Sequence, residues 1–199
     1  NDVLVTGTSN GLSCLLGNYT DEFDYYSTGN LAALDYYQNN LLPTNSSITS
    51  IWKSTDNLIY ASNAVIEGVL NSTQISASNK SRLLGEAYFI RAYLHFYLVN
   101  LYGEIPYVIS TDYQTNATIS KATIPDVYAK LTTDLQQAIS SLPDAYVVAG
   151  RIKPNKSTAY ALMSRVKLYN GDWSQAILYA DIVIQNTSLY NLPTISNVF

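Results

Sequence analysis

Between Ile48 and Leu70 the apolar residues recur at the spacing of three and four positions that marks one face of an α-helix. Thr55 and Ser62 continue the stripe, so the pattern runs through the whole segment. We therefore predict one long amphipathic helix with one face in a core. Its apolar members are Ile48, Ile51, Trp52, Leu58, Ile59, Val65, Ile66, Val69 and Leu70.

A second helical pattern follows, and Gly103 and Pro106 end it. Ser76, Ser78 or Asn79 can cap its start, because short polar side chains accept hydrogen bonds from the free N–H groups of a first turn. Its aromatic residues nearly encircle the helix, which indicates deep burial. Since both segments carry apolar stripes, we expect residues 48–70 and 83–102 to pack as an antiparallel pair.

Two polar residues of the second helix have predicted structural roles. Arg91 lies on the stripe of a helix too apolar to leave it in solvent, so we expect it to be buried and paired. Glu86 lies about 140° away around the helix, so the partner should come from another element or from a backbone carbonyl. His95, the only histidine, lies on the flank of this helix, where we expect packing or hydrogen bonding rather than catalysis.

The rest of the chain continues in helices. Residues 107–121 are rich in Thr and Asn, and we predict an irregular segment there. Thr123 and Pro125 then indicate the start of a third helix, which Pro143 ends. Residues 157–170 and 173–186 then form a hairpin around a Gly-Asp turn. The hairpin resembles a tetratricopeptide unit, with Ala176 and Ala180 as the small residues at its crossing.

Residues 1–47 differ, because their tyrosines stand among Asp, Asn, Ser and Gly with little periodicity. We take the whole chain, 1–199, as one N-terminal domain with a loop-rich part (1–47) and helical repeats (48–199). Recognition groups usually lie on loops that a rigid scaffold holds, so we predict the ligand site in the loop-rich part. In the alternative, these rings pack under the loop. The candidate site residues are Tyr25, Tyr26, Tyr36, Tyr37, Asn39 and Asn40.

Composition excludes several function classes. The net charge of −4 comes without a Lys/Arg-rich run, so the basic patch that nucleic-acid binding requires is absent. One cysteine and one histidine rule out a multi-cysteine or multi-histidine zinc site, and we expect no metal and no cofactor. The acids Asp21, Glu22 and Asp24 are adjacent in a loop, but structural roles as caps or ion-pair partners are the better interpretation. We therefore do not expect an enzyme.

The second helix also carries a family resemblance. Residues 85–93, GEAYFIRAY, and 96–106, FYLVNLYGEIP, resemble the signature helix of SusD/RagB proteins. Residues 21–23, 52–68, 127–143 and 165–184 resemble further parts of the same family. This likeness implies an all-α fold of SusD-like helical hairpins of tetratricopeptide type with long irregular loops.

The resemblance also implies a function. SusD/RagB proteins are lipid-anchored on the outer membrane of Bacteroidetes-type bacteria, where they capture glycans or peptides for a TonB-dependent SusC-like transporter. We expect this sequence to be the N-terminal portion of such a protein, with the lipid anchor outside it. The alternative is a helical-repeat module that binds a protein partner and has no ligand site of its own.

Overall fold

The computed structural model describes residues 11–26, 29, 31–191, 193, 194 and 196. Over these residues the chain forms eight α-helices and no strand; one isolated bridge joins Ile105 and Ala122. The chain divides into two compact units, Asn1–Leu58 and Ile59–Phe199, and the division lies inside helix α3 (Ser46–Asn71). The predicted all-α class is confirmed.

The first unit contains α1 (Leu12–Tyr19), α2 (Leu31–Tyr37) and the first part of α3. Helices α1 and α2 pack against each other. Asn45 joins α2 to the start of α3, because its Nδ2 donates to Asp35 Oδ2 at 2.6 Å while its Oδ1 accepts from the Ser47 backbone N–H at 2.9 Å. The sequence interpretation missed α1 and α2. Buried residues of this unit include Leu12, Leu15, Ala33 and Tyr36.

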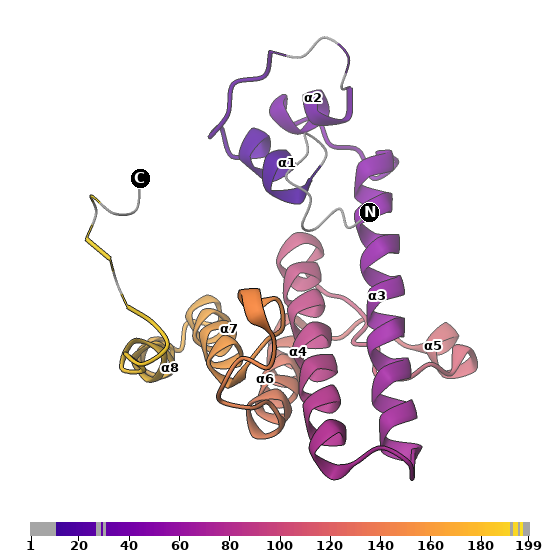
Figure 1. Cartoon of the computed structure of the whole chain (residues 1–199). Helices are drawn as coiled ribbons and strands as arrows, with labels where there is room; N and C mark the ends of the chain where they lie inside the picture. The colour runs from indigo at the N-terminus through magenta and orange to yellow at the C-terminus, as the bar shows by residue number, and fades with distance from the viewer. Residues whose placement is uncertain (1–10, 27–28, 30, 192, 195, 197–199) are drawn as a thin grey trace. The chain divides into compact units, whose positions relative to one another are not determined.

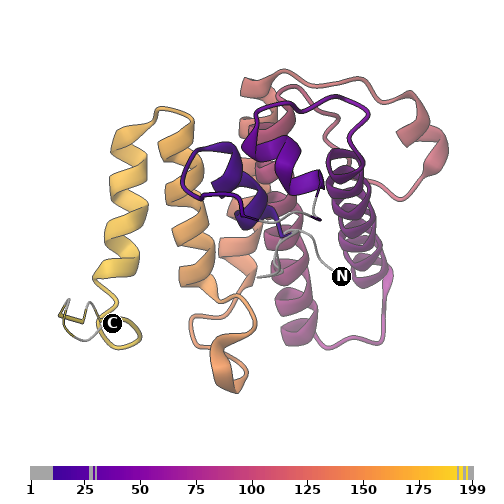
Figure 2. The ribbon, with the colours of Figure 1, turned by 90° about the horizontal axis from the view of Figure 1, so that it is seen from above.

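The second unit is a row of helices. It continues from the end of α3 through α4 (Ala77–Tyr102), α5 (Tyr113–Thr118), α6 (Ile124–Ser141), α7 (Lys156–Tyr169) and α8 (Trp173–Ile184). Helix α4 packs on α6, α6 on α7 and α7 on α8, and Figures 1 and 2 show these four side by side. The residues buried deepest on α6 are Val127, Leu131, Leu135 and Ala138.

The ends of the long helices follow their predicted caps. The Ser76 side chain caps α4 and the Thr123 side chain caps α6, each by accepting a backbone N–H. The part of α3 within this unit, residues 59–71, runs in the opposite direction to α4 (Figure 1), so the predicted antiparallel direction is confirmed for these residues. Lys80 Nζ contributes to this pairing by donating to the Leu70 carbonyl at 3.0 Å.

Two small residues lie at contacts between neighbouring helices. A Cβ at Gly85 of α4 would lie 2.8 Å from Leu142 Cγ, so only glycine allows the end of α6 to pack there. In the last hairpin Ala176 is buried and its carbonyl accepts from Ser164 Oγ at 2.7 Å. Gly171 makes the turn between α7 and α8 with φ of 77°.

Candidate functional site

The two rings of each adjacent tyrosine pair differ in solvent exposure. Tyr26 is 87% exposed, whereas Tyr25 is half-buried and stacks on Tyr37 with 5.9 Å between ring centroids and 29° between planes. Tyr37 is exposed, and its neighbour Tyr36 is only 5% exposed. We name Tyr25, Tyr26 and Tyr37 the tyrosine surface.

Tyr36 belongs to the core of the first unit. Its ring meets Tyr19 edge to face, with centroids 6.4 Å apart and planes at 79°, a favourable arrangement for two aromatic rings. Burial raises the pKa of the Tyr36 phenol above its ordinary value. Among the four candidate tyrosines, Tyr36 is therefore a core residue that stabilises the first unit, and it does not face a ligand.

Asn39 and Asn40 end helix α2. The Asn40 N–H donates to the Asp35 carbonyl at 2.9 Å and the Asn39 N–H donates to the Tyr36 carbonyl at 3.1 Å. Asn39 has φ of 54°. The two backbone hydrogen bonds and this positive φ together form a Schellman cap with Asn39 at its left-handed position. Both asparagine side chains are exposed close in sequence to Tyr37.

One acid beside the tyrosine surface and the backbone of another make structural contacts. Tyr26 Oη donates to Asp24 Oδ2 at 3.2 Å, and the Glu22 N–H donates to the Gly17 carbonyl at 2.9 Å, which holds the segment against the end of α1. In the part of the chain that the structure describes, no three His, Cys, Asp or Glu residues converge as metal ligands would. The surface thus offers flat rings and amides, which suit apolar faces and hydroxyls of a neutral ligand.

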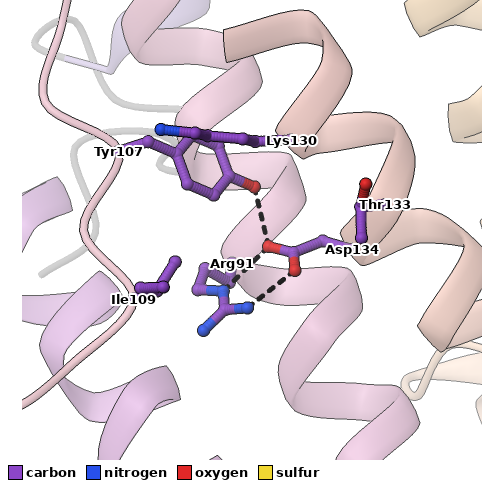
Figure 3. A pocket seen from close by; sticks show the side chains of 6 residues that line it. All are labelled: Arg91, Tyr107, Ile109, Lys130, Thr133 and Asp134. Atoms are coloured by element: carbon purple, nitrogen blue, oxygen red, sulfur yellow. Dashed lines mark hydrogen bonds and ion pairs between the residues drawn. The ribbon is translucent and has the colours of Figure 1, made fainter. Parts of the chain in front are cut away.

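A second polar cluster lies inside the other unit, around Arg91 (Figure 3). Arg91 Nε donates to Asp134 Oδ2 at 2.8 Å, Nη2 to Asp134 Oδ1 at 2.6 Å and Nη1 to Asn63 Oδ1 at 2.8 Å. The prediction that Arg91 is buried and paired with another element is confirmed. Asp134 was missed, although an acid inside the apolar stripe of α6 gives the same signal as Arg91 in α4.

His95 and Tyr107 complete this cluster. Their rings stack with centroids 3.9 Å apart, and Tyr107 Oη donates to Asp134 Oδ2 at 2.7 Å. His95 Nε2 accepts from the Val108 N–H at 3.2 Å, so its proton lies on Nδ1 and is donated to the Arg91 carbonyl at 2.9 Å. Burial lowers the pKa of His95 to about 4 and raises that of Tyr107 well above 10. The predicted structural role of His95 is confirmed.

A hollow of about 240 Å³ opens beside the cluster, between α4, α6 and residues 107–109 (Figure 3). Three polar residues of its wall offer little to a ligand, because Arg91 and Tyr107 already donate to Asp134. The Tyr107 ring is also covered, by His95 in the stack and by Lys130 Nζ at 5.8 Å from its centroid. We conclude that this cluster holds residues 105–111 in place. Its lining residues are Arg91, Tyr107, Ile109, Lys130, Thr133 and Asp134.

The sequence of this chain matches a known protein family. Residues 8–168 match the SusD-like family that is described as "Starch-binding associating with outer membrane". SusD-like protein P2 of Formosa agariphila is 32% identical over 163 residues, which is 78% of this chain and 31% of the relative. SusD-like protein P25 of the same organism is 23% identical over 154 residues, 77% of this chain and 29% of the relative.

Solved structures share the fold. A SusD superfamily protein from Bacteroides vulgatus superposes with a TM-score of 0.78 at 22% identity, over 95% of this chain and 41% of that protein. A laminarin-binding SusD-like protein gives a TM-score of 0.73 at 23% identity, over 79% of this chain and 34% of that protein. The chain spans about a third of the length of its curated relatives. Because the family match covers most of the sequence and the helical row is shared, this chain belongs to the SusD-like family.

Proposed function

We propose that this chain is the N-terminal part of a cell-surface binding protein, without catalytic activity, that captures an oligosaccharide or peptide for a TonB-dependent SusC-like transporter. The family description supports glycan binding at the outer membrane, and one protein of the same fold binds laminarin. An oligosaccharide is the favoured ligand for these two reasons. The relatives are much longer than this chain, so the remainder of such a protein contributes to the proposed activity.

The observation that carries the proposal is the tyrosine surface. Tyr26 is exposed, and its sequence neighbour Tyr25 stacks on Tyr37, so these two rings hold each other in position. Rigid aromatic rings bind the apolar faces of sugars at a small cost in side-chain entropy. The amides of Asn39 and Asn40 lie on the same helix end and supply groups for hydroxyls.

The test uses the full-length protein with Tyr26→Ala and Tyr37→Ala made singly. Binding to laminarin oligosaccharides and to a glycan array should weaken by roughly 3- to 10-fold for each variant, the effect expected from one aromatic contact. Tyr113→Ala is the matched control, because Tyr113 is 75% exposed on α5, away from the tyrosine surface in the sequence. Unchanged glycan affinity in both variants at an unchanged melting temperature would show that the proposed site is wrong.

The second candidate function is a protein-docking module without its own ligand site. Helix α8 favours it, because Ala176 is its only buried residue while Trp173, Ile177 and Ile184 are exposed. Exposed apolar residues on one helix mark protein contacts when they gather in a patch. If Ile177→Ser reduces binding to a partner protein and neither tyrosine variant changes glycan binding, the docking role replaces the first proposal.

The proposed location is the outer face of the outer membrane, with a lipid anchor supplied by other parts of the full-length protein. The family description associates these proteins with the outer membrane. Among the helices of the described residues, none combines the length and the apolar character needed to cross a bilayer. Fractionation of outer-membrane vesicles from cells that express the full-length protein tests the location.

A further inference from the structure

The negative charge of the chain lies in its first unit. Residues 1–58 contain six Asp or Glu and a single basic residue, Lys53, so their net charge is −5. Residues 59–199 contain nine Asp or Glu and ten Lys or Arg, which gives a net charge of +1. The excess of acid therefore belongs entirely to the unit that also contains the tyrosine surface.

Three of these acids lie in the segment that carries Tyr25 and Tyr26. Asp21, Glu22 and Asp24 are all exposed. None of them forms an ion pair within the residues that the structure describes, because the ion pairs there join residues between 82 and 156. An exposed carboxylate is ionised at neutral pH. The segment that leads to the tyrosine surface thus carries three negative charges, and no ion pair neutralises them.

The end of α1 holds the backbone of the first two acids in place. Asp21 is left-handed, with φ of 60°. The Glu22 and Phe23 N–H groups both donate to the Gly17 carbonyl, at 2.9 and 3.3 Å. The Phe23 ring also packs on Gly17 so closely that a Cβ there would overlap it. This helix end resembles the one that Asn39 forms after α2, and it fixes the direction in which the acidic segment leaves the helix.

The third acid contacts the most exposed ring of the tyrosine surface. Tyr26 Oη donates to Asp24 Oδ2 at 3.2 Å, and Tyr26 is 87% exposed. A ligand stacked on this ring is separated from the carboxylate only by the length of the ring and one hydrogen bond. That separation is shorter than the screening length of about 8 Å at physiological ionic strength. A negative group on the ligand is therefore repelled there, whereas a hydroxyl group is not.

We propose that Asp21, Glu22 and Asp24 make the tyrosine surface selective for uncharged glycans, because they repel glycans that carry carboxylate groups. The inference rests on the proposed function and adds a ligand class to it. The acids act on the charge of the ligand and not on its hydroxyls. Like-charge repulsion of an unwanted ligand is a general source of specificity. At an exposed surface this repulsion is screened by salt, so the selectivity should be strongest at low ionic strength.

The test compares two probes that share one backbone. They are laminarin oligosaccharides and the same oligosaccharides oxidised at C6 to glucuronates. Isothermal titration calorimetry measures the affinity of the full-length protein for each probe in about 20 mM and about 500 mM NaCl, which changes the screening length severalfold. At the lower salt concentration the wild-type protein should bind the neutral probe at least about fivefold more tightly than the oxidised probe. This ratio should decrease at the higher salt concentration.

The decisive variant is Asp21→Asn/Glu22→Gln/Asp24→Asn, which removes three charges and nearly keeps the side-chain shapes. Asparagine tolerates the left-handed backbone at position 21, and at position 24 it still accepts from Tyr26 Oη. At low salt the affinity for the oxidised probe should rise by roughly 3- to 10-fold, while that for the neutral probe stays within about twofold. Asp24→Asn alone leaves the end of α1 unchanged and should give a smaller rise.

The matched control is Glu104→Gln/Asp126→Asn/Asp181→Asn, which removes three exposed acids of the second unit. It should keep the wild-type ratio of the two affinities. The inference is overturned if the wild-type protein binds both probes equally, or if neither Asp24→Asn nor the triple variant of the first unit changes the ratio. A wild-type protein that binds neither probe would contradict the proposed glycan ligand itself, and the inference would fall with it.

Discussion

Arg91 and Asp134 lie 43 residues apart in the sequence and form a two-point ion pair whose side chains are 7% and 6% exposed. The pair joins α4 to α6. Tyr107 Oη also donates to Asp134 Oδ2, and Arg91 Nη1 donates to Asn63 Oδ1. Burial lowers the pKa of Arg91, but hydrogen bonding to Asp134 and its charge raise it, and the net shift is upward. Arg91 is therefore charged throughout the physiological pH range.

The first prediction is that Asp134→Ala destabilises the protein by about 3–5 kcal/mol, because it leaves a buried guanidinium without a counter-charge. Urea unfolding of the full-length protein measures the free energy of unfolding. Arg91→Met combined with Asp134→Leu should recover part of this loss, since no charge is then buried.

The control for this prediction is Arg82→Ala. Arg82 Nη1 lies 2.7 Å from Glu86 Oε1 in α4, but this pair is partly exposed. Such a surface pair contributes less than about 1 kcal/mol. Equal losses for Asp134→Ala and Arg82→Ala would contradict the role given to the buried pair.

The second prediction concerns pH and His95. The pKa of His95 is about 4 in the folded protein against 6.5 for an ordinary histidine. Between these values the unfolded chain binds a proton that the folded protein does not, so stability falls as pH decreases from 6.5 to 4. The loss should reach about 3 kcal/mol.

Unfolding free energies of the full-length protein at pH 7 and pH 4.5 measure this effect. Carboxylates contribute their own pH dependence, so the comparison is with His95→Gln, which cannot titrate. The difference between pH 7 and pH 4.5 should be smaller in the variant. A difference of the same size in both proteins would mean that His95 does not couple to stability.

The third prediction compares two glycines within helices. Gly85→Ala should destabilise the protein by about 1–3 kcal/mol, because the new Cβ would overlap Leu142. Gly68→Ala should instead stabilise it by about 0.4–1 kcal/mol, since a Cβ at Gly68 meets nothing within 4 Å and alanine is the better helix former. Thermal unfolding of both variants measures the change in melting temperature. A change in the same direction in both variants would refute the packing argument.

Helices with long stripes could be predicted from the sequence, and short ones could not. Helices α3, α4 and α6 carry several turns of apolar periodicity and recognisable caps such as Ser76 and Thr123. Helices α1, α2 and α5 have 8, 7 and 6 residues, too few turns for a periodic signal. Helices this short are marginal in isolation and depend on tertiary packing.

The site was predictable in part for a similar reason. That one ring of each adjacent tyrosine pair could point outward follows from local geometry. Which ring does so depends on the packing of α2 against α1, which places Tyr36 inside and Tyr37 outside. Burial of Arg91 likewise follows from its stripe, whereas its partner Asp134 is brought to it only by the docking of α6 on α4.

The last prediction separates two roles of Asn39. Its left-handed φ of 54° ends α2, and its exposed amide belongs to the proposed glycan site. Asn39→Gly keeps the backbone conformation without strain, so stability should stay the same or rise slightly, while Asn39→Ala should cost about 1 kcal/mol. If the amide binds a sugar hydroxyl, both variants lose glycan affinity by roughly 3- to 10-fold, the value of one hydrogen bond.

Melting temperature and affinity for laminarin oligosaccharides are measured on the full-length proteins. Wild-type affinity in Asn39→Gly, with a loss confined to the less stable Asn39→Ala, would show that Asn39 serves the helix end alone and would remove it from the site.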